Sequence, residues 1–390
     1  MKELSERYKL SLGVLSCLER VYREELEPVL EALKKPGEKH FFRINTLKAT
    51  KAEVLNRFKD MDLIAGEDEV ISEALYLPVE GPFEISFPDK KIMVDKPTAE
   101  SAMMGINVYA PGVRKCSGIR LNDKLAIIDP YMQSVASGIA RMSEREILGP
   151  RKGLAVEVTS AIYKVPNLRE TSEYKEGLIY LQSKPSILTS KVLDPNPNEL
   201  IVDLTCSPGG KLSHISQLMR NEGKIIAVDR NRKKISTTRE TLQRLGCKNV
   251  ELLVQDGRYF HIDLPNIKAD KCIVDPPCSA LGITPKLYDF TSEKEINSLA
   301  DYQKQFLKAA TRIVKKGGKI IYSVCTITIE ECERVAEFAV NECELELEEQ
   351  ISYLSSRGLA SEDFQEADLL QRFHPHKDGM GYFIAQFKRT

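Results

Sequence analysis

Short apolar runs alternate with longer amphipathic segments from about residue 170 to the end of the chain. This pattern predicts strands and helices in alternation. The strands are expected at 199–204, 224–229, 250–256, 271–275 and 317–324, and the helices at about 211–220, 231–245, 298–315 and 330–343. The strand runs are apolar throughout, which is typical of a parallel sheet covered on both faces. The alternation therefore predicts a doubly wound α/β sheet.

The first 170 residues show a different pattern. Residues 1–35 carry apolar side chains at spacings of three and four and end in Lys-Lys-Pro-Gly, which indicates helix. A strand at 40–48 and a charged helix at 51–60 follow, so an α+β (RRM-like) part is expected. Between 84 and 166, short strand-like runs separated by turn residues predict a small all-β module. The expected parts are 1–90, 91–168 and 169–390.

Composition narrows the class of protein. The chain has 390 residues, of which 42% are hydrophobic and 29% charged, as in a globular protein of two or three domains. Because no apolar run is long enough to span a bilayer and the first residues do not form a signal peptide, we expect a cytoplasmic protein without a membrane partner. Nine scattered cysteines argue against a disulfide framework. The lack of a Cys-x-x-Cys pair and the presence of only five histidines argue against a metal site.

Charge alone does not point to a nucleic acid. The formal net charge is −1, so there is no overall basic signature. Basic groups occur at 114–124 and 230–234, and each by itself is typical of a solvated surface. An RNA partner therefore has to be argued from sites.

The turn after the first strand of the α/β part has the character of a ligand-binding loop. It reads Thr205-Cys206-Ser207-Pro208-Gly209-Gly210-Lys211. The glycines let a ligand approach the backbone and the positive N-terminal end of the next helix. The turn matches neither GxGxxG nor GxxxxGK[ST], which disfavours a dinucleotide or a nucleoside triphosphate.

Four successive strands end in an acid: Asp203, Asp229, Asp256 and Asp275. Each alone is typical of a turn whose carboxylate satisfies loop amides. Because the carboxyl ends of the strands meet at one edge of an open α/β sheet, the four acids are expected to line one crevice. This pattern favours a nucleoside cofactor without a triphosphate. S-adenosylmethionine fits best, since its ribose and adenine require acids and apolar walls and its sulfonium brings no phosphate.

Two cysteines lie where predicted strands run into polar turns, Cys278 in DPPCSALG and Cys325 in YSVCTIT. Both strands belong to the same predicted sheet, so both thiols are expected to face the same crevice. A thiolate beside an acid and a sulfonium donor suits methylation of carbon 5 of a pyrimidine, because thiolate addition at carbon 6 makes carbon 5 nucleophilic. The other cysteines, taken singly, are typical of small buried hydrophobes.

These motifs together resemble the Nop/Sun (Fmu-type) RNA cytosine-5 methyltransferases. RINTLK at 43–48 and RFHPHKDGMGYFIAQFK at 372–388 add to the resemblance. It implies that Cys325 is the nucleophile, that Cys278 assists release and that Asp275 contacts the base, with Lys211 in the same catalytic group. It also implies a Rossmann-like, S-adenosylmethionine-dependent fold. The residues expected to contact the cofactor are Thr205, Cys206, Ser207, Pro208, Gly209, Gly210, Lys211, Asp229, Arg230, Lys234, Asp256, Gly257 and Asp275.

The middle segment resembles a PUA domain, a small β-barrel module that binds RNA. The match begins at Val94-Asp95-Lys96 and continues through LAIID (125–129) and ASGIARMS (136–143). An inserted PUA module, together with the stretch 180–199, resembles the acceptor-end tRNA subgroup that contains the sixth human Nop/Sun protein and its archaeal counterparts. This implies a monomer that binds the acceptor stem and CCA end of tRNA. The expected RNA contacts are Lys96, Tyr109, Ala110, Pro111, Gly112, Arg114 and Lys115.

The chain departs from the family pattern in three places. Thr205-Cys206-Ser207 replaces Cys-Ala-Ala, Pro276 replaces the alanine of Asp-Ala-Pro-Cys, and Thr284 replaces the arginine of Gly-x-Arg-Pro. The missing arginine removes one expected polar or phosphate contact, for which Lys286 is a candidate replacement. Three alternatives stay open: ribosomal RNA as the substrate, a non-catalytic RNA-binding protein on the same fold, and an amino-group methyltransferase.

Overall fold

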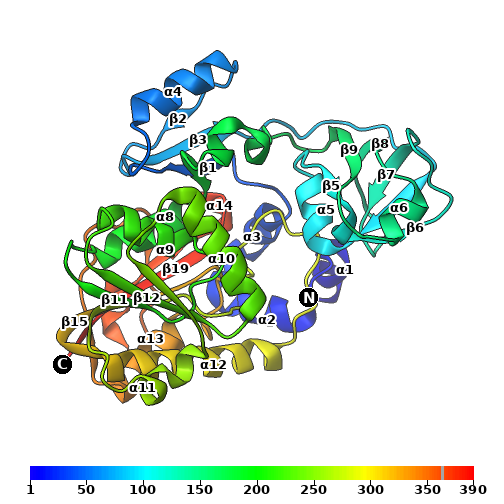
Figure 1. The fold of residues 1–390 in the computed structure, drawn as a ribbon. Coiled ribbons are helices and arrows are strands. Elements are labelled where there is room, and N and C mark those ends of the chain that lie inside the picture. The colour runs from blue at the N-terminus through cyan, green and yellow to red at the C-terminus, as the bar shows by residue number, and fades with distance from the viewer. Residues whose placement is uncertain (362–363) are drawn as a thin grey trace.

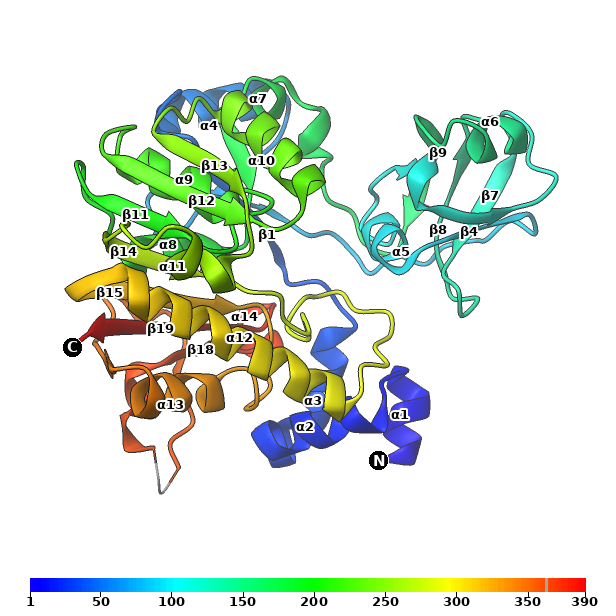
Figure 2. The same ribbon diagram turned by 60° about the horizontal axis from the view of Figure 1, so that its bottom comes forward.

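Among the described residues, three β-sheets organise the chain. The computed structural model describes residues 1–361 and 364–390. A large sheet flanked by helices forms the main body, a small sheet lies against it, and a six-stranded module stands apart on long connections (Figures 1 and 2). No described helix combines the length and the apolar composition needed to cross a membrane.

Three short helices, rather than one helical stretch, occupy the N-terminal residues. They are α1 (Lys2–Tyr8), α2 (Leu12–Tyr22) and α3 (Leu26–Leu33). Lys9 and Arg23 adopt positive φ angles of 49° and 46°, which end the helical path at each point. The spacing of apolar residues predicted helix but not these turns. They allow the helices to pack against Leu281, Ile296 and Ile327 of the C-terminal part.

A four-stranded antiparallel sheet follows in the order β10-β1-β3-β2. Its elements are β1 (Lys39–Ile44), α4 (Lys51–Asp60), β2 (Gly66–Glu67), β3 (Ala74–Pro78) and β10 (Ile179–Leu181). Phe58 of α4 stacks on Phe42 of β1, with ring centroids 5.1 Å apart. Because β10 pairs with β1, this unit takes an edge strand from beyond the six-stranded module. The RRM-like description and the boundary at residue 168 stay predictions.

The segment predicted to be all β forms a sheet in the order β5-β9-β8-β7-β4-β6. Its elements are β4 (Lys91–Val94), α5 (Lys96–Ala102), β5 (Val108–Tyr109), β6 (Val113–Cys116), β7 (Lys124–Ile128), β8 (Ser134–Ala140), α6 (Glu144–Leu148) and β9 (Leu154–Ala161). Ile92, Leu125, Ile127 and Val135 lie in its core, which Leu287 of the C-terminal part joins. The module is therefore docked onto the main body through apolar contact. Closure into a barrel stays a prediction.

The large sheet has the order β13-β12-β11-β14-β15-β19-β18-β17, with β16 beside β19. Its strands are β11 (Leu200–Asp203), β12 (Lys224–Asp229), β13 (Val250–Val254), β14 (Ala269–Val274), β15 (Val314–Val324), β16 (Leu345–Leu347), β17 (Ser356–Arg357), β18 (Gln371–Phe373) and β19 (Tyr382–Arg389). The strands β11 to β15 are parallel, as predicted. The remaining pairs are antiparallel, and the sequence pattern did not predict them.

Helices cover both faces of this sheet (Figures 1 and 2). One face carries α8 (Lys184–Leu193), α9 (Gly210–Leu218) and α10 (Arg232–Leu245), and the other carries α11 (Phe260–Asp263), α12 (Glu293–Ile313) and α13 (Glu333–Glu342). Short helices α7 (Ser172–Lys175) and α14 (Pro375–Asp378) lie in connections. Neighbouring residues of β14 face opposite cores, Cys272 toward α12 and Ile273 toward α9. This explains why the strands are apolar throughout.

Candidate active site

A cavity of about 420 Å³ opens at the carboxyl ends of β11 and β14. The order of strands reverses at this place, because β12 lies on one side of β11 and β14 on the other. A doubly wound sheet binds its ligand at such a switch point. The cavity walls are Tyr180, Leu181, Gln182, Ser183, Ser186, Asp203, Thr205, Cys206, Ser207, Pro208, Gly209, Gly210, Lys211, Asp275 and Ile283. The whole predicted loop 205–211 thus lies with two of the four predicted acids.

The glycine turn is shaped by its neighbours. Gly209 adopts a left-handed conformation with φ 100° and caps the N-terminus of α9. A Cβ on Gly210 would come within 2.9 Å of the Tyr180 ring. Arg43, the first residue of RINTLK, donates to the Gly210 carbonyl oxygen (3.2 Å) and to Ser213 Oγ (3.0 Å). Its burial lowers the pKa of the guanidinium to about 10. Arg43 of RINTLK therefore holds the glycine turn and the first turn of α9 in place, a role that the sequence did not reveal.

Asp203 is a buried carboxyl in the wall of this cavity. Its Oδ1 accepts a hydrogen bond from the Thr205 backbone N–H (3.0 Å). Burial raises the pKa of Asp203 to about 7. A poorly solvated carboxyl beside a cavity is a ready acceptor for hydroxyl groups of a bound ligand.

The chemistry of the lining fits S-adenosylmethionine. Asp203 offers an acceptor, the glycine turn leaves backbone exposed, and Leu181 and Ile283 supply apolar wall. Lys211 is the one cation among the described lining residues, and Asp275 already neutralises it. No lining cation is therefore left to receive a phosphate, as expected for a nucleoside with a sulfonium.

Asp275 lies at the centre of a hydrogen-bond network that joins β11, β14, β15 and β19. Its backbone N–H donates to Thr205 Oγ1 (2.9 Å), and its Oδ2 lies 2.6 Å from Lys211 Nζ. Ser323 Oγ donates to Asp275 Oδ1 (3.2 Å) and accepts from the Tyr382 hydroxyl (3.2 Å). Burial alone would lower the pKa of Lys211, but the Asp275 carboxylate outweighs it and the pKa is raised. Lys211 is thus a fixed cation, and its contact with Asp275 holds that carboxylate in one orientation.

The two predicted thiols meet beside this network. Cys278 Sγ lies 3.4 Å from Cys325 Sγ, and the Gly282 N–H donates to the Cys325 carbonyl oxygen (3.0 Å). The hydrogen bond with Cys278 lowers the pKa of Cys325 against the opposing effect of burial. The same hydrogen bond raises the pKa of Cys278. The two thiols therefore differ in reactivity, with Cys325 the better nucleophile at neutral pH.

A buried carboxylate fixes the two loops that carry these thiols. Glu331 accepts hydrogen bonds from Ser279 N (2.8 Å) and Gln303 Nε2 (2.9 Å), and from Thr326 Oγ1 (3.2 Å) and Thr328 Oγ1 (3.2 Å). Ser279 follows Cys278 and Thr326 follows Cys325. Burial raises the pKa of Glu331. The sequence did not single out Glu331, Ser323 or Tyr382, although Ser323 and Tyr382 lie in the quoted motifs and Glu331 follows one of them closely.

Asp229 and Asp256 lie outside the walls of this cavity. They follow β12 and β13 as predicted, but Asp229 accepts from the Asn231 N–H (2.8 Å) and Asp256 pairs with Arg258 (2.7 Å). Arg258 lowers the pKa of Asp256. Two of the four acids, Asp203 and Asp275, line this cavity, whereas β12 and β13 lie progressively farther from the switch point. Cofactor contacts from Asp229, Arg230, Lys234, Asp256 and Gly257 stay predictions.

The predicted RNA-binding residues lie on one part of the six-stranded module. Tyr109 is exposed at the end of β5, and Arg114 and Lys115 are exposed on β6. Arg114 lies 3.3 Å from Asp95, and Lys96 lies 3.2 Å from Asp289 of the main body. Ala110 is buried, and Gly112 lies tightly against Thr98, so 110–112 shapes the backbone and offers few side-chain contacts.

The Gly-x-Arg-Pro departure has a structural consequence. Thr284 Oγ1 donates to the Gly379 carbonyl oxygen (2.6 Å). Lys286 is buried, and its Nζ donates to the Ala280 carbonyl oxygen (3.0 Å). Burial lowers the pKa of Lys286. Lys286 braces the loop in this conformation and does not present its charge to the surface, where a replacement for the missing arginine would have to lie.

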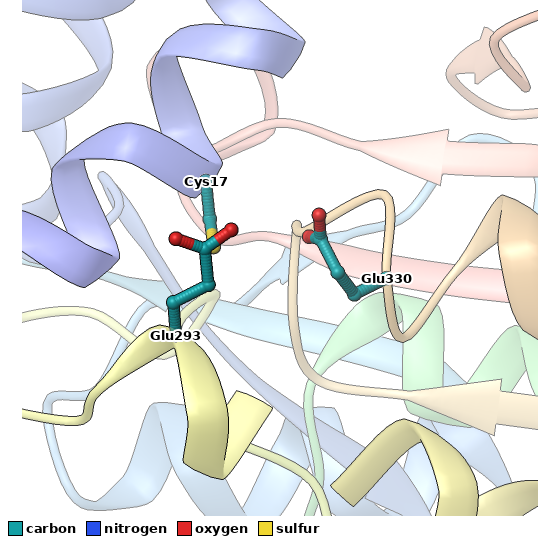
Figure 3. A group of neighbouring side chains, drawn as sticks. All are labelled: Cys17, Glu293 and Glu330. Carbon is teal, nitrogen blue, oxygen red and sulfur yellow. The ribbon is translucent and has the colours of Figure 1, made fainter. Parts of the chain in front are cut away.

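Cys17, Glu293 and Glu330 place their ligand-type atoms within 4.8 Å of one another (Figure 3). Arg20 Nη2 lies 2.8 Å from each carboxylate and 3.2 Å from Cys17 Sγ. A guanidinium therefore already neutralises this group. It links α2 to α12 and to the turn before α13, and we assign no metal to it.

Comparison with known proteins places this geometry in context. A family model described as 16S rRNA methyltransferase RsmB/F matches residues 190–388, and a PUA domain model matches residues 90–162. A tRNA (cytosine(72)-C(5))-methyltransferase of Pyrococcus horikoshii is 37% identical, over 100% of this chain and 97% of its own length. The human tRNA (cytosine(72)-C(5))-methyltransferase NSUN6 is 27% identical over 93% of this chain and 91% of its own. The crystal structure of NSun6 from P. horikoshii with SFG, an analogue of S-adenosylmethionine, superposes with a TM-score of 0.88 at 36% identity, covering 98% of this chain and 99% of that one.

Proposed function

The chain belongs to the RsmB/F methyltransferase family and is an S-adenosylmethionine-dependent tRNA cytosine-5 methyltransferase with a PUA domain, and from that premise we propose where on tRNA it acts and through which residues. The target is a cytidine near the 3′ acceptor end, held through the acceptor stem and the CCA end. The support is that relatives similar to the whole chain, PUA domain included, carry names that specify cytosine 72 of tRNA. The family model named for ribosomal RNA matches the catalytic part alone.

The reaction proceeds through a covalent adduct at Cys325. The Cys325 thiolate adds to carbon 6 of the cytosine, and carbon 5 then takes the methyl group that S-adenosylmethionine supplies. Loss of the carbon 5 proton and elimination of the thiolate restore the ring and free the enzyme. The observation that carries this proposal is the unequal thiol pair, 3.4 Å apart beside Asp275.

Asp275 and Lys211 prepare the site for this addition. The Asp275 carboxylate is anchored by Ser323 and Lys211, and the Asp275 backbone N–H by Thr205, so the carboxylate holds the nitrogen edge of the base in one orientation. Such preorganised polar groups stabilise the charge that develops as the thiolate adds. Cys278 is the group that assists release of the product. Thr205 to Lys211, with Asp203, hold the methyl donor.

Two cysteine variants test the roles of the thiols. Cys325→Ala is expected to abolish methyl transfer, because no thiolate remains to add to carbon 6. Cys278→Ala is expected to trap a protein–RNA adduct that survives denaturing electrophoresis. Cys247→Ala, which removes a half-buried cysteine that is not a member of the Cys278–Cys325 pair, is the matched control and is expected to behave as the unmodified enzyme. Full activity in Cys325→Ala would overturn the assignment.

Bisulfite sequencing of tRNA and ribosomal RNA, incubated with the enzyme and methyl donor, tests the site of methylation. A single new 5-methylcytidine in the acceptor stem is the expected result, and modification confined to ribosomal RNA would contradict it. We further propose a monomer that needs no metal and works in the cytoplasm. Light scattering and activity in the presence of a chelator check the first two of these points, and imaging of a tagged protein checks the third.

A further inference from the structure

Three aromatic rings from two parts of the chain meet where the PUA domain adjoins the catalytic domain. Tyr131 comes from the turn between β7 and β8, and Tyr288 and Phe290 come from the segment between Cys278 and α12. The ring centroid of Tyr131 lies 4.6 Å from that of Tyr288 and 5.2 Å from that of Phe290, and Tyr288 stacks on Phe290 at 5.7 Å. We name these three residues the junction cluster.

The outer rings of the junction cluster are not filler between domains. Tyr131 keeps 47% of its surface exposed and Phe290 keeps 48%. Rings that served only to join two domains would be covered by them. A cluster that holds its rings together and leaves two of them open is a surface on which a further planar group can stack.

Both sides of the cluster are held rigidly. The buried Asp129 carboxylate accepts from the N–H groups of Tyr131 (2.9 Å) and Gln133 (2.8 Å), which fixes the turn that presents Tyr131. On the other side, the Asp289 N–H donates to the Lys9 carbonyl oxygen (2.9 Å), and Lys34 Nζ donates to the Leu287 carbonyl oxygen (2.8 Å). The rings therefore need little ordering when a ligand arrives.

Aromatic character and position indicate the ligand. Lys96 Nζ lies 5.1 Å from the centre of the Tyr288 ring, but it also lies 3.2 Å from Asp289, so this cation is already paired and the rings carry the argument. Exposed, clustered aromatic rings are features that bind unpaired nucleotides, because every base can stack on them. The segment that carries Tyr288 and Phe290 starts at Cys278 and includes Ile283, which lines the cavity. A nucleotide strand resting on the cluster would thus lie on the segment that continues back to Cys278.

We propose that Tyr131, Tyr288 and Phe290 form a stacking platform for unpaired nucleotides at the 3′ end of tRNA. This rests on the proposed function, since it assumes that the acceptor end is the part of tRNA that is bound. The platform holds the single-stranded tail by stacking and is tolerant of sequence. It thereby positions the adjoining stem so that its terminal cytidine reaches the site.

The test compares two acceptor-stem hairpins with the same stem, one with a four-nucleotide 3′ tail and one blunt, binding to the full-length protein. Fluorescence anisotropy measures both dissociation constants for the unmodified enzyme and for Tyr131→Leu/Phe290→Leu, which keeps apolar volume but removes two aromatic faces. Tyr131→Phe/Phe290→Trp keeps the faces. Phe83→Leu, with a comparable exposed fraction of 46%, is the control.

The tailed hairpin is expected to bind the unmodified enzyme more tightly than the blunt one. In the double leucine variant this advantage falls by about ten-fold or more, the order expected for loss of base stacking, while blunt-hairpin binding is unchanged. The aromatic variant and Phe83→Leu keep the advantage. Because stacking carries no charge, the slope of affinity against salt is the same in all variants.

Two results would overturn the proposal directly: equal affinity of the unmodified enzyme for the tailed and blunt hairpins, or a double leucine variant that still prefers the tailed hairpin. An equal loss of affinity for both hairpins in the leucine variant would also overturn it, because the cluster would then only join the two domains. Thermal unfolding of each variant confirms that it is folded, and the aromatic variant decides the matter if the leucine variant is not. Methylation of intact tRNA by the unmodified enzyme tests the proposed function separately. The platform can fail while that activity stands.

Discussion

Cys278 Sγ and Cys325 Sγ lie 3.4 Å apart although 47 residues separate them in the chain. The contact arises because β14 and β15 are neighbouring parallel strands, with Val274 in register with Tyr322, so their carboxyl ends meet at the same edge of the sheet. Cys278 lies four residues beyond the end of β14, and Cys325 directly follows β15. The pairing gives the two thiols opposite pKa shifts, and this difference is open to measurement.

Removal of the Cys278 thiol is expected to make Cys325 less acidic. The hydrogen bond from Cys278 is the main cause of the lowered pKa of Cys325, so Cys278→Ala shifts this pKa upward. At neutral pH the thiolate fraction falls, and alkylation of Cys325 by iodoacetamide slows. Mass spectrometry of the labelled peptide at a series of pH values gives the profile. Cys247 in the same digest serves as the internal control, and an unchanged Cys325 profile would contradict the prediction.

Glu331 is expected to act as a positioning residue for the two thiol loops. Glu331→Ala removes the acceptor shared by Ser279 and Thr326, so kcat falls by about ten-fold or more with little change in KM for tRNA. Glu331→Gln keeps part of the network and loses less. The KM-against-kcat split in a methyl-transfer assay is the measurement. The nearby half-buried acid Glu337 provides the control variant Glu337→Gln, and a rise in KM alone would argue against positioning.

Asp203→Asn is expected to alter the dependence of stability on pH. The folded-state pKa of Asp203 is about 7, above its ordinary value of 3.8, so the folded protein binds the extra proton between these values. The unmodified protein therefore loses stability as pH rises from about 4 through 7, by at most about 4 kcal/mol from this group, while the variant does not.

The comparison of melting temperatures at pH 5 and pH 8 measures this effect without bound methyl donor. The melting temperature of the variant, relative to that of the unmodified protein, is expected to rise from pH 5 to pH 8. Titrating groups that the two proteins share cancel in this difference. Asp301→Asn, which removes an exposed carboxylate on α12, gives the control pair of curves. Parallel pH curves for Asp203→Asn and the unmodified protein would show that Asp203 is not held protonated by burial.

Arg43→Met is expected to weaken binding of the methyl donor without weakening binding of tRNA. The change removes two hydrogen bonds that hold Gly210 and Ser213 in place, so the glycine turn is less well ordered before the ligand arrives. A loss of about five-fold in affinity, measured by calorimetry, is the size expected for one modest hydrogen bond. Lys39→Met on the same strand removes an exposed cation and serves as the control. Equal affinities for the two variants would remove Arg43 from this role.

Local sequence patterns were enough to predict the parallel strands and the residues that follow them. Apolar runs predicted the five parallel strands, because a strand covered on both faces has apolar side chains at nearly every position. The glycine turn, Asp203, Asp275 and the two cysteines follow strand ends, where a parallel sheet places its ligand site whatever the rest of the fold does. The motifs also indicated the family, the methyl donor and the PUA domain.

Other features depended on contacts between distant residues. The antiparallel strands β16 to β19 were missed because their short segments carry no distinctive alternation. Arg43, Glu331 and Tyr382 each act through a partner 52 or more residues away, so no local spacing marks them.

The sequence by itself determined the class of fold, the position of each of the two thiols after a strand and the composition of the glycine turn, because each depends on residues that are close together in the chain. Only the tertiary structure decided that two of the four acids line the cavity, that Lys286 is buried, and that Tyr131 meets Tyr288 and Phe290 at the domain junction. The order of strands and the docking of the PUA domain set these relationships. They arise from long-range packing, which local pattern does not encode.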